Sequence, residues 1–256
     1  FLAWGWRVPF WVSLLLLLVS IKARIALHET PIFHELQAQA RLSRTPLRDC
    51  FRDRQTLARM GILFLCISAG GAVLFFSAQV YSGVFLKTVA GLSGADSSLL
   101  VAIGTAILFP LTLLAGWLSD RIGRRPVVIA GLSLGCLSVY PVFAQWLALG
   151  ATTPQAFGSA ALLMMWITLP LALVTGPQTA LLAELFPAKT RYSAAALPHN
   201  LSAGWIGGLL PLIVTYINDR TGDPLAGLWY PTILLGVALI IAIRWLPETR
   251  GCDLTR

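Results

Sequence analysis

The sequence predicts an all-α membrane protein with seven transmembrane spans. Hydrophobic residues make up 57% of its 256 residues and charged residues 12%, whereas a soluble domain is typically about a quarter charged. The apolar residues form runs long enough to cross a bilayer as a helix, which takes about 20 residues. These runs are solid blocks, whereas the strands of membrane barrels alternate apolar and polar residues. Helices in a bilayer are therefore expected.

Seven apolar spans follow one another along the chain. A long polar stretch separates the first span from the other six, which shorter loops join. Proline and glycine inside the spans are compatible with this interpretation, because both are more frequent in membrane helices than in soluble ones. The expected spans are 8–26, 60–86, 98–118, 127–149, 156–183, 194–217 and 228–246.

The basic residues fall in alternate loops, which supports the number of spans and predicts their orientation. Of the 19 Lys and Arg residues, three lie on one side of this topology: Arg7, Lys87 and Arg220. Cytoplasmic loops are enriched in Lys and Arg, so the long polar stretch and the C-terminus are expected to be cytoplasmic. The basic residues on that side are Lys22, Arg24, Arg41, Arg44, Arg48, Arg52, Arg54, Arg59, Arg121, Arg124, Arg125, Lys189, Arg191, Arg244, Arg250 and Arg256.

Three regions are expected. Residues 1–28 form one transmembrane helix, and residues 60–256 form a six-helix block. Residues 29–59 mix acidic residues with many arginines. We expect this stretch to be a cytoplasmic central loop with amphipathic helical pieces near the lipid headgroups. The lipid bilayer is therefore an expected partner of the whole chain.

Several other functional classes are disfavoured. The four cysteines show neither metal-ligand spacing nor a secreted disulfide pattern. The sequence has no paired His–Glu metal motif, no Gly-x-Ser-x-Gly turn and no Ser/His/Asp set at span depth. We therefore expect no metal, no cofactor and no enzymatic activity. The net charge of +8 follows from the basic loops and needs no nucleic-acid partner.

The most informative segment is the short loop between the third and fourth spans, Gly-Trp-Leu-Ser-Asp-Arg-Ile-Gly-Arg-Arg-Pro. Its first glycine permits close helix packing and its second permits a tight turn. Asp120 can cap a helix N-terminus, and the arginines lie where anionic headgroups and acidic side chains are available. A plain basic turn is the alternative interpretation. The residues of this signature loop are Gly116, Asp120, Arg121, Gly123, Arg124 and Arg125.

This loop resembles the signature loop of the major facilitator superfamily, Gly-x-Leu-x-Asp-Arg-x-Gly-Arg-Arg, at all of its characteristic positions. In that superfamily the motif occurs in both halves of a twelve-helix protein, after the second and the eighth helix. The resemblance implies a conformational latch, in which the Asp and Arg residues hold the two halves together in one state and release them in the other.

Other stretches are similar to the metabolite–proton symporter family, which includes carriers for proline and betaine, α-ketoglutarate, shikimate and citrate. Residues 183–193, with Leu-Pro-His-Asn at 197–200, resemble that family's tenth-to-eleventh helix region. Residues 4–10 resemble the start of its sixth helix, and residues 246–251 resemble the close of its twelfth. The resemblance implies a C-terminal six-helix half plus one preceding helix, with the first five helices missing.

The function that the resemblance implies is secondary active transport in the bacterial inner membrane. Proton-coupled symport of a small organic acid or zwitterionic metabolite would proceed by alternating access, with the missing N-terminal half as a partner. The solute site of such carriers lies near the midplane between the halves. The alternative is a truncated, transport-inactive membrane protein or an assembly partner.

Polar residues inside the spans are candidates for a substrate cavity. They could bind a carboxylate or zwitterion, or they could bond neighbouring helices. Arg191 could pair with Glu184 or Asp120 as part of a cytoplasmic gate formed by Glu184 and Arg191, and a plain basic loop is the alternative. Charged residues are absent from the depth of every predicted span, so proton-relay groups are expected in the missing half. The candidate cavity residues are Gln79, Tyr81, Gln178, His199 and Asn200.

Overall fold

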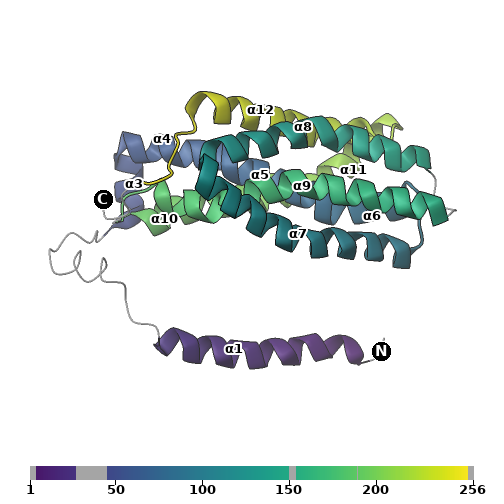
Figure 1. Ribbon diagram of the computed structural model, residues 1–256, viewed down its shortest axis with the longest axis horizontal. Coiled ribbons are helices and arrows are strands. Elements are labelled where there is room, and N and C mark those ends of the chain that lie inside the picture. Colours follow the sequence, from purple (N-terminus) through teal and green to yellow (C-terminus); the bar gives the residue numbers. More distant parts are fainter. Residues whose placement is uncertain (1–3, 27–44, 150–153, 189, 253–256) are drawn as a thin grey trace. The chain divides into compact units, whose positions relative to one another are not determined.

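The computed structural model describes residues 4–26, 45–149, 154–188 and 190–252, and every regular element within these ranges is helical (Figure 1). Seven of the described helical stretches are long and apolar enough to cross a membrane. They match the seven predicted spans in order, so that prediction is confirmed. The chain divides into two compact units, residues 1–44 (unit 1) and 45–256 (unit 2).

Unit 1 contributes one described span. A short 3-10 turn, η1 (Gly5–Arg7), leads into α1 (Val8–Ala26). The apolar residues of this helix find no cover within the unit itself. Such a helix is stable where lipid or other apolar surface surrounds it.

Unit 2 contains six spans, three of which are built from several helical pieces. Inside each span the pieces follow one another directly or across the two-residue turn at 208–209. In chain order, the elements are α3 (Pro46–Arg52), α4 (Arg54–Ile62), η2 (Leu63–Ser68), α5 (Ala69–Phe75), η3 (Phe76–Tyr81), α6 (Ser82–Thr88), α7 (Gly94–Ile122), α8 (Arg124–Leu149), α9 (Pro154–Glu184), α10 (Arg191–Leu201), η4 (Ser202–Gly207), α11 (Leu210–Thr221), η5 (Ala226–Leu228) and α12 (Trp229–Trp245).

The second and sixth spans of the chain contain wide π-helical turns at η2, η3 and η4. Such turns weaken the regular backbone ladder and are frequent at functional sites. A side chain crosses between two of them, because Ser202 Oγ donates a hydrogen bond of 2.8 Å to the Phe64 carbonyl. The irregular parts of the two spans therefore lie against each other.

Helix α9 packs against both α7 and α8. Glycines permit the closest approaches, because a Cβ on Gly176 would lie 2.8 Å from the Gly116 backbone nitrogen. A Cβ on Gly131 would likewise lie 2.8 Å from Cγ2 of Val174. The expected close packing at Gly116 is therefore present, and its partner is Gly176.

The second span begins earlier than predicted. Asp53 caps α4 by accepting the Thr56 backbone N–H at 3.1 Å, and the helix runs on from Arg54 into the span. Residues 45–59, which the sequence assigned to the central loop, pack within unit 2, where α3 and α4 contact α10. The part of that loop at 29–44 lies outside the described residues, as does His28.

Candidate functional site

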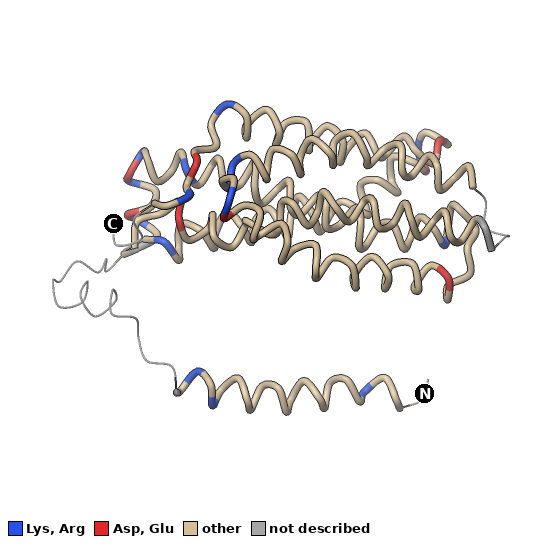
Figure 2. The backbone as a smooth tube through the Cα atoms, viewed as in Figure 1, with Lys and Arg blue, Asp and Glu red and all other residues tan. Residues whose placement is uncertain are grey.

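The loop between α7 and α8 lies at the end of unit 2 where basic residues gather (Figure 2). Asp120 and Arg121 belong to the last turn of α7, and Arg124 begins α8. Between them, Gly123 has a φ of 111°, a conformation that favours glycine because a Cβ would clash. The tight turn expected at Gly123 is therefore present.

Arg124 is the centre of the charged contacts at this turn. Its guanidinium pairs with Asp120, four residues earlier across the Gly123 turn, and lies 3.2 Å from Oε1 of Glu184 at the end of α9. The side chains of Arg124 and Glu184 are 12% and 13% exposed, whereas that of Asp120 is 62% exposed. The same guanidinium donates to Ser119 Oγ at 2.7 Å, and Thr249 Oγ1 donates to Glu184 at 2.5 Å. One arginine thus joins α7, α8, α9 and the C-terminal segment.

A second carboxylate, that of Glu248, caps α8. It accepts the backbone N–H groups of Arg124 at 2.9 Å and Arg125 at 3.1 Å, the first two of that helix. It also accepts those of Thr249 and Arg250. Burial raises the pKa of Glu248, but these four hydrogen bonds outweigh burial and hold the pKa below its usual value. The positive end of the helix dipole adds to the attraction.

The expectation that Asp120 could cap a helix is not met at α8, where Glu248 takes that place. Gly123 gains a second role, because a Cβ there would overlap the Glu248 carboxylate. The role of Glu248 carries little signal in the sequence, because its partners lie 123 and 124 residues away. The local signal was an acid directly after Pro247, where the last helix has ended.

The turn between α9 and α10 holds the two residues of the expected gate. Glu184 contacts Arg124, as described above, while Arg191 donates from Nε to the Phe186 carbonyl at 3.2 Å. Arg59, from α4, donates to the Leu185 carbonyl of the same turn at 2.8 Å. Arginines from two elements therefore hold this turn through its backbone.

Two of the five candidate cavity residues meet. Nδ1 of His199 lies 3.3 Å from Ser68 Oγ and 3.4 Å from Nε2 of Gln178. The three side chains come from α10, η2 and α9, so they form a polar junction among three spans. The amide nitrogen of Gln178 can only donate, whereas the Ser68 hydroxyl can donate or accept, so the direction of the second contact depends on the tautomer of His199.

Gln79 and Tyr81 lie on η3 and face different surroundings. Oε1 of Gln79 accepts from Thr105 Oγ1 at 2.8 Å, while its buried Nε2 has no hydrogen-bond partner among the described residues. Tyr81 is 2% exposed, and its ring stacks on Phe143 at 5.5 Å. Its hydroxyl accepts from Nδ2 of Asn218 at 3.1 Å. Tyr81 is therefore largely a core residue, with its hydroxyl tip beside a cavity of about 530 Å³ that Asp219 also lines.

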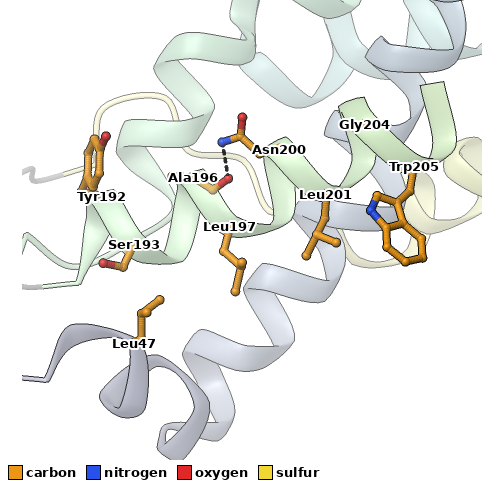
Figure 3. Close-up of a pocket in the computed structure, with 9 residues that line it drawn as sticks. All are labelled: Leu47, Tyr192, Ser193, Ala196, Leu197, Asn200, Leu201, Gly204 and Trp205. Carbon is orange, nitrogen blue, oxygen red and sulfur yellow. Dashed lines mark hydrogen bonds between the residues drawn. The ribbon is translucent and has the colours of Figure 1, made fainter. Parts of the chain in front are cut away.

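Asn200 follows His199 on α10, and its side chain lines a separate groove of about 550 Å³ (Figure 3). Its amide donates to the Ala196 carbonyl of its own helix at 2.8 Å. Tyr192 and Trp205, which also line the groove, are 87% and 71% exposed. The five candidates are thus distributed over several surfaces. Within the described ranges, His, Cys, Asp and Glu nowhere form a group of three that could hold a metal.

Comparison with known proteins shows which family this chain resembles. A family model described as Major Facilitator Superfamily matches residues 1–197 and, in an overlapping second match, residues 83–253. The inner membrane metabolite transport protein YhjE of Escherichia coli (strain K12) is 30% identical and covers 98% of this chain and 56% of its own length.

Further relatives are similar over the same region. A citrate-proton symporter of Salmonella typhi is 29% identical over 89% of this chain and 50% of its own length. A candidate proline/betaine transporter of Staphylococcus aureus (strain MSSA476) is 28% identical over 93% of this chain and 50% of its own length. The chain therefore spans about half the length of these curated relatives, all of which are named for transport.

Proposed function

The chain belongs to the major facilitator superfamily, and on that premise we propose that it forms the C-terminal half of a proton-coupled symporter in the bacterial inner membrane. Its solute would be a small organic acid or a zwitterionic metabolite, moved by alternating access between two halves. The observation that carries this proposal is the charged junction around Arg124. Relatives named for citrate–proton symport and for inner-membrane metabolite transport support the same proposal.

The charged junction has one part that is buried within this half and one part that is exposed and could contact the second half. Arg124 and Glu184 are shielded and bind each other inside this half, whereas the Asp120 carboxylate is 62% exposed. We propose that Asp120 and Arg121 supply the latch contact to the second half. Arg124 and Glu184 would hold the helix ends of this half together at the proposed gate. Arg191 would contribute separately, through its hydrogen bond to the backbone of the next turn. This end would face the cytoplasm, because it carries most of the basic residues.

The unpartnered donor of Gln79 supports an acidic or zwitterionic solute. Leaving a buried amide N–H unpaired costs free energy, and hydrogen bonds to charged groups are stronger than neutral ones. The carboxylate of a solute bound between the two halves would accept a hydrogen bond from Nε2 of Gln79. His199 and Gln178 offer a second polar position, and Asn200 a third on its groove.

Uptake into proteoliposomes tests the proposal. The chain would be reconstituted alone and joined to an N-terminal half, with an imposed inward proton gradient and labelled citrate, proline and betaine. Accumulation by the joined protein, abolished by a protonophore, supports proton symport. Uptake at the same rate with and without the proton gradient would contradict proton coupling. If neither protein moves any of these solutes, a transport-inactive assembly role becomes the better hypothesis.

A further inference from the structure

The end of unit 2 that carries the signature loop has more cations than carboxylates. Three acids lie around the loop itself, and each is engaged: Asp120 and Glu184 pair with Arg124, and Glu248 caps α8. Asp49 and Asp53 lie at the same end of the unit, on α3 and at the start of α4. No carboxylate partner is recorded among the described residues for four nearby arginines. These four are Arg121, Arg125, Arg244 and Arg250.

Hydrogen bonds to backbone carbonyls place two of these arginines at the ends of α12 and α7. Nη2 of Arg125 donates to the Ile243 carbonyl at 2.6 Å, which fixes its guanidinium on the last turns of α12. Nη1 of Arg250 donates to the Arg121 carbonyl. A guanidinium has five N–H donors, so each of these contacts leaves further donors for an anion.

An exposed apolar stripe on α12 leads to this charge. Ile233, Val237 and Ile240 are 60%, 43% and 63% exposed, and their spacing of four and three residues places them on one helix face. Arg244, which is also exposed, follows four residues later on the same face. Trp245 beside it is 59% exposed, and tryptophan is enriched where a membrane meets water.

We propose that this surface binds an anionic phospholipid. The acyl chains would lie along Ile233, Val237 and Ile240, and the phosphate would contact the guanidinium groups of Arg125 and Arg244, with Arg250 and Arg121 at the rim. Arginine suits this ligand, because its planar fork donates two hydrogen bonds to a phosphate. A zwitterionic headgroup would gain less, because its own cation would face the same arginines.

Native mass spectrometry of the detergent-solubilised chain tests the proposal, with phosphatidylglycerol and phosphatidylcholine as probes. We expect phosphatidylglycerol to be retained at several-fold lower lipid concentration than phosphatidylcholine. Each arginine near an anionic surface contributes roughly a factor of five. The double variant R125Q/R244Q should therefore raise the phosphatidylglycerol concentration for half occupancy roughly twenty-five-fold.

Arg220 provides a matched control, because it lies at the other end of unit 2 with its guanidinium over the Tyr216 ring. R220Q should change the half-occupancy concentration less than about two-fold. Equal retention of the two lipids, or an equal loss in R220Q and in the double variant, would overturn the proposal. A helical circular dichroism spectrum confirms that each variant is folded.

Inorganic phosphate separates a lipid site from a site for a free anion. We expect it to leave phosphatidylglycerol bound, because it lacks the acyl chains that contact the α12 stripe. Displacement of the lipid by inorganic phosphate at matched ionic strength would assign the arginines to a soluble phosphate instead. These outcomes do not depend on transport, so they stand apart from the test of the proposed function.

Discussion

The Glu248 carboxylate lies 2.9 Å from the backbone nitrogen of Arg124, so a residue just beyond the last span caps a helix that begins 124 residues earlier. Through this contact, the C-terminal segment packs against the loop that carries the signature residues. The arrangement relates the end of the chain directly to the charged junction proposed to control transport.

Removal of this cap should destabilise the six-helix unit. We expect Glu248→Gln to lower the free energy of unfolding by about 1 kcal/mol, because the amide loses the charge that favours the N-terminus of α8. The measurement is thermal unfolding of the detergent-solubilised chain. Asp223→Asn is a suitable control, because that carboxylate accepts a backbone N–H at the other end of the unit. An equal effect of the two substitutions would argue against a special role of the cap.

The same contact predicts a pH dependence. The folded-state pKa of Glu248 is depressed, so its contribution to stability is fully present above the ordinary glutamate pKa of about 4.3. It is lost as the pH falls through the lower folded value. The difference in unfolding temperature between the wild type and Glu248→Gln should therefore be constant near pH 7 and shrink below about pH 4. A difference that grows as the pH falls would contradict the assignment.

The two acids that bind Arg124 should differ in their effects. Glu184→Gln leaves a shielded arginine short of its charge partner and should cost about 2 kcal/mol. Asp120→Asn removes an exposed partner and should cost less than about 0.5 kcal/mol. Unfolding midpoints of the two variants measure this contrast, and similar losses would show that exposure does not separate the pairs.

Asp120 should matter more for transport than for stability. In the complete carrier, we expect Asp120→Asn to slow uptake more than it weakens solute binding, because a latch acts on the equilibrium between conformations. Equilibrium binding of the labelled solute and its rate of uptake separate these effects. Equal losses of binding and rate would count against the latch.

Gly176 and Gly116 face each other but should tolerate alanine unequally. A Cβ on Gly176 would lie 2.8 Å from the Gly116 nitrogen and 2.9 Å from the Thr112 carbonyl, whereas one on Gly116 would have its nearest contact at 3.6 Å. Gly176→Ala should therefore lower the free energy of unfolding by roughly 1–3 kcal/mol, because the added methyl group overpacks the helix contact. Gly116→Ala should leave the free energy of unfolding nearly unchanged. Comparison of the two unfolding midpoints checks this prediction.

Gln79 is expected to act in solute binding. Gln79→Ala removes the unpartnered buried donor, and we expect the KM for the transported acid to rise roughly ten-fold with little change in the maximal rate. Asn200→Ala tests the same role on the groove of Figure 3. Thr105→Val is the control, because it removes the hydroxyl that binds Gln79 without touching the free donor. Unchanged kinetics would assign Gln79 to packing.

The sequence by itself determined the membrane class, the seven spans, their order and the turn at Gly123. These features depend on local properties: the length of an apolar run, the position of basic residues between runs, and a backbone conformation that glycine favours. The lower bound of the second span was less well predicted. Asp53 caps that helix from within a polar stretch, where hydropathy gives no signal.

The tertiary structure alone decided which charged groups meet. Arg124 binds Glu184 across 60 residues, and Glu248 rather than Asp120 caps α8. It also separated Tyr81, packed on Phe143, from His199 and Gln178 at their shared junction. A polar residue in an apolar run carries no local mark of the helix face or the distant neighbour that it will meet. That choice is made only when the six spans pack and most buried polar groups find a partner.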